Sequence, residues 1–285
     1  MKQEVIDAVQ SFRESIKAVP SGELIFPTSV DASRRVLRAV ENPDIGVASL
    51  AKILVAEPLL SAKVIRLANS VALNPAGQIV RDVRQAVLRV GMDPIKSLAM
   101  ALVVDQLRQA QRHGACRELS NRLWERSVHV AALSYVMARK MTSLNADEAM
   151  FAGVVHDLGR FYLLSKIADY PELLADKAVL AETINDLDEA ASTLVFSALN
   201  LPVSVIEAVA SARKYGNTMP PATLGDLLFV AKMVSPRHDP ISELDARIVA
   251  ASNAAVALKI DQGTVEDVIA ASGNEIYSIV VALEG

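Results

Sequence analysis

The chain has 285 residues, of which 52% are hydrophobic but only 4% aromatic, and its formal net charge is −4. This length is enough for one large domain, or two modest ones, with a sizeable core. Because aromatic residues are scarce, the core must consist of aliphatic side chains, which suit closely packed helices. The negative charge argues against a nucleic-acid partner, since no basic field attracts phosphate groups.

Cysteine content and hydropathy favour a cytoplasmic protein. The single cysteine, Cys116, cannot form an internal disulfide, which fits a reducing compartment. The N-terminal residues are amphipathic and lack the apolar core of a signal peptide. The longest apolar stretches, such as residues 98–104, are far shorter than a membrane span. We therefore expect no membrane partner.

Apolar residues recur at spacings of three and four along most of the chain, which predicts helices rather than strands. The helices predicted in the first part of the chain cover residues 5–16, 30–40, 47–55, 59–70, 79–90 and 94–112. Those predicted in the second part cover residues 119–141, 146–158, 186–199, 202–215, 223–234, 241–258, 264–272 and 275–283. Loops are expected at residues 20–27, 74–77 and 216–221, where proline, glycine and asparagine gather.

These elements predict an all-α, two-lobed, multi-helical protein. The best internal boundary lies at residues 112–116, which contain His113 and Gly114. We expect an N-terminal helix, a helical N-terminal lobe, a second helical lobe, and C-terminal helices that cover the second lobe or serve an interface; their ranges are 1–19, 20–113, 114–235 and 236–285.

The sharpest local feature is the dipeptide His156-Asp157. Imidazole and carboxylate groups both ligate divalent metals, and a bound metal would activate water for attack on a phosphoester. A functional site needs a further histidine and a further carboxylate from other helices. On this dipeptide alone we favour a structural interpretation, in which His156 is a hydrogen-bonded core histidine and Asp157 bonds backbone near a helix end.

Four phrases in a fixed order extend this signal. They are Glu57-Pro58-Leu59-Leu60 with the following residues 63–70 that end in Asn69-Ser70, the helix that ends at Gly91, Trp124-Glu-Arg-Ser127, and residues 151–159 around His156-Asp157. Together they resemble the HDOD family, relatives of the HD metal-dependent phosphohydrolases, over about residues 20–235. Glu57 stands where the family usually has aspartate. The resemblance implies a second lobe that is an HD-like helical bundle and a role in bacterial signal transduction.

The same resemblance argues against catalysis. It places Arg126 where active HD enzymes carry their first ligating histidine, and Lys232 where they carry a final aspartate. Arginine has no lone pair to give to a metal. His129 follows on roughly the same helix face and would substitute only with a shifted geometry, so we favour a packing role for it. We expect no bound metal, no cofactor and no catalytic residue: a pseudoenzyme.

Two interpretations of the replaced positions stay open. Arg126 and Lys232 would form an anion-friendly pocket near His156 that holds a phosphate or a nucleotide without hydrolysis. Alternatively, Arg126 pairs with Asp157 as a buried ion pair that replaces the metal as a structural link. We favour the ion pair, because buried charges need partners. For Asn69 and Ser70 we favour capping and stitching of the N-terminal helices over partner binding.

Three functional hypotheses follow. The first is a non-catalytic module of signal transduction that binds an unidentified signalling protein. The second is a divergent phosphohydrolase or phosphodiesterase that uses His129, His156 and Asp157. The third is a sensor of a phosphate or nucleotide ligand. The sequence gives no prediction of the oligomeric state.

Overall fold

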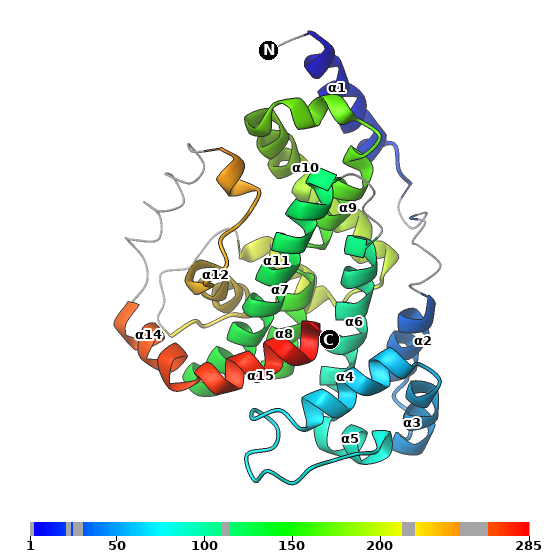
Figure 1. The fold of residues 1–285 in the computed structure, drawn as a ribbon, viewed down its shortest axis with the longest axis vertical. Coiled ribbons are helices and arrows are strands. Elements are labelled where there is room, and N and C mark those ends of the chain that lie inside the picture. Colours follow the sequence, from blue (N-terminus) through cyan, green and yellow to red (C-terminus); the bar gives the residue numbers. More distant parts are fainter. Residues whose placement is uncertain are drawn as a thin grey trace.

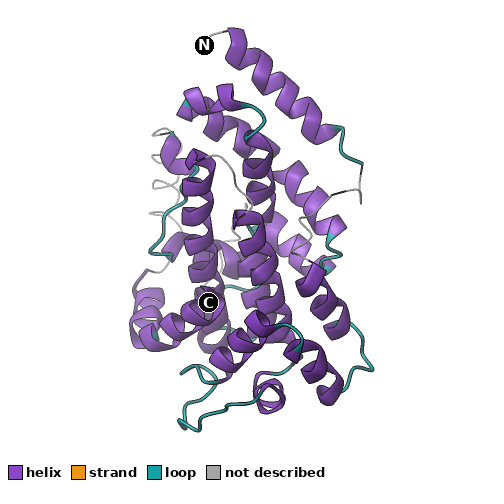
Figure 2. Cartoon of the chain, turned by 45° about the vertical axis from the view of Figure 1, so that its right-hand side comes forward, coloured by secondary structure: helices purple, strands orange, loops and turns teal. Residues whose placement is uncertain are grey.

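The computed structural model describes residues 3–20, 24, 31–109, 114–212, 220–245 and 262–284. All regular structure in these residues is helical (Figure 2), as the spacing of apolar residues predicts. The elements of the first part are α1 (Gln3–Lys17), α2 (Asp31–Val40), α3 (Val47–Val55), α4 (Pro58–Ala68), α5 (Val83–Val90) and α6 (Met92–Gln109).

The second part of the chain is equally helical. Its elements are α7 (Gly114–Met141), α8 (Ala146–Val155), α9 (Leu158–Ile167), η2 (Pro171–Ala175), α10 (Lys177–Ala198), α11 (Val203–Ser211), α12 (Leu224–Val234), η3 (Ser242–Leu244), α14 (Gln262–Ala271) and α15 (Gly273–Glu284). None of the described helices is long and apolar enough to span a membrane. The predicted lobe boundary falls partly on residues 110–113, which lie outside the described residues, as do most of the loops predicted at 20–27 and 216–221.

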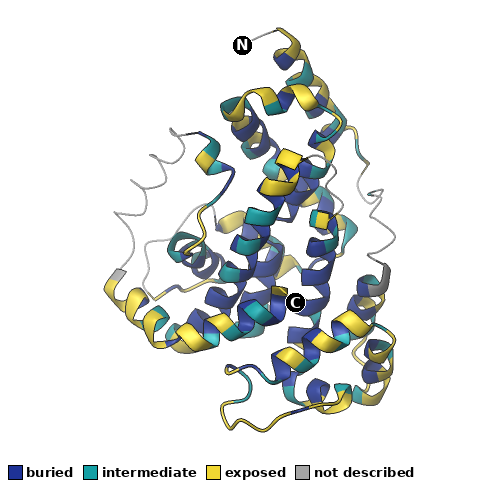
Figure 3. Cartoon of the chain, viewed as in Figure 1, coloured by how far each residue is buried: buried dark blue, intermediate teal, exposed yellow. Residues whose placement is uncertain are grey.

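The centre of the molecule is the pair α7 and α8, with α6 beside them (Figure 1). The facing stretches of both helices are dark in Figure 3, because most side chains are buried in residues 123–138 of α7 and 149–155 of α8. Gly153 of α8 faces Ala131 of α7, and a Cβ atom at Gly153 would lie 2.4 Å from the Ala131 Cα atom. The two helices therefore approach so closely that only glycine fits there.

The N-terminal helices α2 to α5 gather at one end of the molecule, against α6 (Figure 1). Pro58 opens α4, a position where the missing N–H group of proline costs nothing. Asn69 follows the last turn of α4, and its side chain accepts from the Val80 N–H at 2.8 Å and donates to the Val80 carbonyl at 2.7 Å. This double hydrogen bond ties the end of α4 to the segment before α5, which is the kind of contact that the stitching interpretation of Asn69 expects.

The C-terminal helix α15 crosses α7 and reaches α4, and it thereby joins the C-terminal part of the chain to the N-terminal helices (Figure 1). Lys63 of α4 is buried and donates to the Leu283 carbonyl at 2.7 Å, in the last turn of α15. Arg66 donates to the Val281 carbonyl at 3.2 Å. Cations at a helix C-terminus satisfy carbonyl groups that have no partner within the helix.

Three helix predictions are wrong at their boundaries. Gly159 does not stop a helix: it lies inside α9, where a Cβ atom would sit 2.3 Å from the Ser192 hydroxyl of α10, so the glycine serves close packing. The helix predicted from Ile79 begins at Val83, because Asn69 holds Val80. The pattern also missed most of α9 and the first half of α10.

The helix predicted over residues 241–258 is wrong where the structure describes it. Residues 242–244 form the single turn η3, because the Asp239 side chain accepts from the Ile241 N–H at 3.0 Å and from the Ser242 hydroxyl at 2.8 Å. Residues 246–258 lie outside the described residues.

The contact at Gly153 yields a prediction on stability. Gly153→Ala should lower the free energy of unfolding by about 2 kcal/mol, because the new methyl group pushes α8 away from α7. Gly114→Ala is the matched control, since a Cβ atom there meets nothing within 4 Å; its effect should stay within about 0.5 kcal/mol. Urea unfolding followed by circular dichroism measures both, and equal stabilities for the two variants would contradict the close approach.

Candidate functional site

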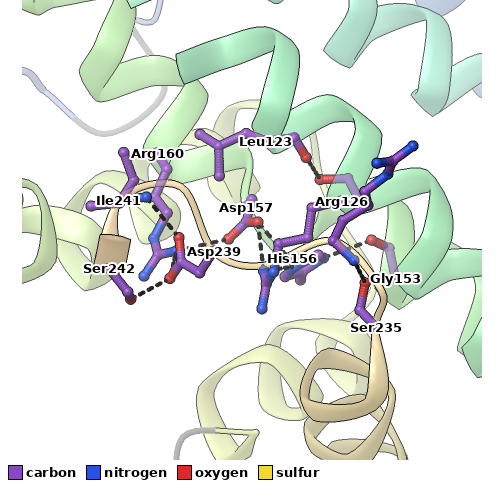
Figure 4. A network of polar contacts seen from close by, with 12 residues as sticks. Leu123, Arg126, Gly153, His156, Asp157, Arg160, Ser235, Asp239, Ile241 and Ser242 are labelled. Atoms are coloured by element: carbon purple, nitrogen blue, oxygen red, sulfur yellow. Dashed lines mark hydrogen bonds and ion pairs between the residues drawn. The ribbon is translucent and has the colours of Figure 1, made fainter. Parts of the chain in front are cut away.

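The junction of α8 and α9 brings the predicted residues together. His156 follows the last turn of α8, Asp157 precedes the first turn of α9, and Arg126 extends from the middle of α7 toward both (Figure 4). All three side chains are buried, with 5%, 3% and 2% of Arg126, His156 and Asp157 exposed. Three polar side chains at this depth must satisfy one another, because little water reaches them.

Arg126 is bound to both members of the His-Asp pair. Its Nη1 atom lies 3.0 Å from His156 Nε2 and 3.1 Å from Asp157 Oδ2. His156 Nδ1 lies 2.7 Å from the Gly153 carbonyl, which can only accept, so Nδ1 carries the proton. Burial lowers the pKa of His156, which keeps the ring neutral and leaves Nε2 as an acceptor for the guanidinium. The ion pair favoured from the sequence is therefore present between Arg126 and Asp157.

The Asp157 carboxylate stays charged despite its burial. Burial alone raises its pKa, but the guanidinium groups of Arg160 and Arg126 outweigh this effect and hold the pKa well below its usual range. Arg160 of α9 is the second cation, with Nη1 3.5 Å from Asp157 Oδ1. One buried carboxylate thus bridges two arginines from different helices.

Arg160 extends the network to parts of the chain that the sequence did not connect with the site. Its Nη1 lies 2.9 Å from Asp239, its Nε lies 3.4 Å from Asp188 of α10, and its Nη2 donates to Asn185 at 3.1 Å. The sequence reasoning missed these residues. Arg160 could have been predicted, since residues three positions apart at the start of a helix lie close together and Arg160 follows Asp157 at that spacing. Asp239 gave no signal, because it lies beyond the resemblance.

Lys232 of α12 is half-buried beside this network. Burial, reinforced by the neighbouring Arg126 guanidinium, lowers the pKa of Lys232 to about 8. Its ammonium group makes no hydrogen bond or ion pair with any residue that the structure describes. Arg126, Arg160 and Lys232 face the carboxylates of Asp157, Asp188 and Asp239, so the charges balance when Lys232 is protonated. A balanced set of charges calls for no additional ion.

His129 does not join the site. Its Nδ1 atom lies 2.7 Å from the Glu125 carbonyl of the preceding helical turn. No hydrogen bond or ion pair joins His129 to His156 or to Asp157. This geometry supports the packing role over a shifted ligand role. Ser70 is buried and its hydroxyl has no hydrogen-bond partner within the described chain, so only Asn69 of that motif ties backbone together.

The metal that an HD-type fold implies does not fit the residues present. Two donor atoms, His156 Nε2 and Asp157 Oδ2, face one another at 3.0 Å, and Arg126 Nη1 lies within 3.1 Å of both. A metal ligated by them would stand about 2 Å from each, in the space that the guanidinium fills. Across the described ranges, no group of three or more His, Cys, Asp and Glu side chains is placed to hold a metal ion.

The Arg126–Asp157 pair yields a prediction on stability. Arg126→Met should lower the free energy of unfolding by about 3 kcal/mol, because it leaves Asp157 and His156 without the hydrogen-bond donor that they share. A double-mutant cycle with Asp157→Asn should show a coupling energy of about 1–3 kcal/mol. An Asp whose pKa is depressed contributes stability above its unfolded-state value, about 3.9, and loses it below. The coupling energy should therefore be equal at pH 7 and pH 5; a value near zero at pH 7 would contradict the pair.

Comparison with known proteins agrees with this fold. The family model described as the HDOD domain matches residues 26–214, inside the range predicted from the sequence. A search of curated proteins gives no match. Among solved structures, a proposed metal-dependent phosphohydrolase from Shewanella amazonensis SB2B has a TM-score of 0.72 at 21% identity, over 99% of this chain and 100% of that one.

Two further solved structures share the fold. One is an HDOD domain protein with unknown function from Geobacter sulfurreducens, with a TM-score of 0.61 and 18% identity, over 98% of this chain and 99% of that one. The other is a proposed signal transduction protein from Marinobacter aquaeolei VT8, with a TM-score of 0.60 and 18% identity, over 98% of this chain and 66% of that one. Because the family model covers most of the chain, the protein belongs to the HDOD family.

Proposed function

We propose that this HDOD protein is a non-catalytic regulatory module that acts in signal transduction by binding a protein partner. The observation that carries the proposal is the position of Arg126, whose Nη1 atom lies 3.0 Å from His156 Nε2 and 3.1 Å from Asp157 Oδ2. These are the two atoms that a hydrolase of the HD type would offer to a metal. In this chain the guanidinium group of Arg126 is already within hydrogen-bond distance of both atoms.

The chemistry of the guanidinium group supports the proposal. Metal-assisted hydrolysis needs ligands with free lone pairs and an open position for water. Arginine carries only donors and remains charged at every physiological pH, so it neither ligates a cation nor accepts a proton from water. With Arg126 and Arg160 on either side, Asp157 is a structural anion. The protein from Marinobacter aquaeolei, which shares the fold, is named for signal transduction.

A second candidate function rests on Lys232. Its ammonium group has no hydrogen bond or ion pair within the described residues, and the buried Nε atom of Arg126 also lacks a partner there. Two free donor groups on neighbouring cations are suited to a phosphate. The charge balance of the network favours the structural interpretation, so a sensor for a phosphate or a nucleotide is the second candidate.

The first test measures metal and hydrolysis together. Protein purified without chelator should contain less than about 0.1 equivalents of transition metal, and it should not hydrolyse bis-p-nitrophenyl phosphate with added Mn²⁺. The variant Arg126→His/Lys232→Asp restores lone-pair donors at both replaced positions and should gain Mn²⁺ binding in calorimetry. Arg35→His is the matched control, because Arg35 of α2 pairs with Glu57 among the N-terminal helices. Stoichiometric metal and hydrolysis that disappear in Asp157→Ala would contradict the proposal.

The second test addresses the ligand sensor. If the remnant site holds only its own ion network, millimolar inorganic phosphate and cyclic nucleotides should leave the melting temperature within about 1 °C of the value without ligand. A rise of several degrees that disappears in Lys232→Met would favour the sensor instead. Lys177→Met, on the exposed start of α10, controls for phosphate binding to surface lysines.

A further inference from the structure

The segment that precedes α5 is held rigidly, although two of its side chains face water. Asn69 clamps the Val80 backbone, and Arg89 donates to the Gln78 carbonyl at 2.7 Å. Val80 is buried, whereas its neighbours Ile79 and Arg81 are exposed, with 69% of Ile79 accessible. The fold therefore presents Ile79 and Arg81 in fixed positions.

The outer face of α5 continues this arrangement. Arg84 and Leu88 are four residues apart, so they lie on the same side of the helix, opposite its buried residues. Leu88 is 64% exposed. Arg81 and Arg84 make no hydrogen bond or ion pair with any described residue. We call Ile79, Arg81, Arg84 and Leu88 the α5 surface: two exposed aliphatic side chains and two unpaired cations.

Asp82 is an exposed carboxylate between the two arginines, and its side chain caps α5 by accepting from the Gln85 N–H at 2.9 Å. The wider region around α5 is nevertheless basic. Residues 31–96 carry ten basic and six acidic side chains, a net charge of +4, in a chain whose net charge is −4. Several of the basic residues are engaged, as Arg35 is with Glu57 and Lys96 with Glu41. Arg81 and Arg84 are not, so their field is available to a partner of opposite charge.

We infer that the α5 surface docks an acidic amphipathic helix of the signalling partner. The apolar face of such a helix would cover Ile79 and Leu88, and its carboxylates would pair with Arg81 and Arg84. Arginine beside exposed aliphatic side chains is typical of protein interfaces, where bidentate guanidinium–carboxylate pairs give specificity. A second copy of this surface would place arginine against arginine. The inference rests on the proposed function, since it names the surface through which a partner binds.

The test uses a defined probe rather than an unknown partner. A helical peptide of about 18 residues, with leucines spaced three and four apart and flanked by glutamates, is titrated against the full chain by fluorescence anisotropy. A second peptide replaces each glutamate by lysine. The wild-type protein should bind the acidic peptide, should bind the basic peptide at least about tenfold more weakly, and should lose affinity as salt rises.

Variants locate the binding. The variant Arg81→Glu/Arg84→Glu should bind the acidic peptide at least about tenfold more weakly than the wild-type protein does, and it should now bind the basic peptide. This variant should fold, because acidic residues are favourable at the start of α5. Leu88→Gln should lower the affinity of the wild-type protein for the acidic peptide and that of the charge-reversed variant for the basic peptide. Lys177→Glu is the matched control, because it reverses an exposed charge in the first turn of α10 and should change nothing.

Three outcomes would overturn the inference: no binding of the acidic peptide at millimolar concentration, equal binding by the charge-reversed variant, or binding of anionic phosphatidylserine vesicles in place of the peptide. None of these affects the proposed function, because metal content and hydrolysis decide whether the site is catalytic. Conversely, an active metal site would refute the non-catalytic proposal while the peptide titration still reports on the α5 surface.

Discussion

The guanidinium group of Arg126 is the constraint on which the centre of the molecule depends. It lies in the core between α7 and the α8–α9 junction, where an unpaired charge would destabilise the fold by several kcal/mol. His156 accepts from it as a neutral ring, and Asp157 accepts from it as an anion. The break between α8 and α9 brings these two acceptors side by side. The junction thereby places both acceptors within reach of the guanidinium group, and the guanidinium group satisfies both of them.

Arg160 extends the ion-pair network from Asp157 toward other parts of the chain. Through Asp188 and Asp239 it joins α10 and the segment after α12 to the central helices. Asp239 also fixes the turn η3 by accepting from Ile241 and Ser242. A set of balanced charges therefore links elements that lie far apart in the sequence (Figure 4). Each of these links is an ion pair or a hydrogen bond between side chains or between a side chain and backbone.

The N-terminal helices use polar side chains in a similar way. Asn69 holds Val80, Arg89 holds the carbonyls of Ala68 and Gln78, and Lys63 holds the end of α15. Each side chain satisfies backbone groups where a helix ends, so the loops between short helices become fixed. These hydrogen bonds hold the backbone on either side of Ile79, which is exposed together with Arg81, and they connect the Asn69 motif with the α5 surface.

Most of the helices and the all-α fold class were predictable from the sequence, because the spacing of apolar residues is a local property. The errors occurred where distant contacts override local signals: Gly159 allows α10 to approach, and Asn69 keeps Val80 out of a helix. The sequence alone also determined that Arg126 cannot ligate a metal, since a guanidinium group has no lone pair to donate. Only the tertiary structure decided that Arg126 contacts both His156 and Asp157 and that Arg160 meets Asp239, because helix packing sets which distant charges come within bonding distance.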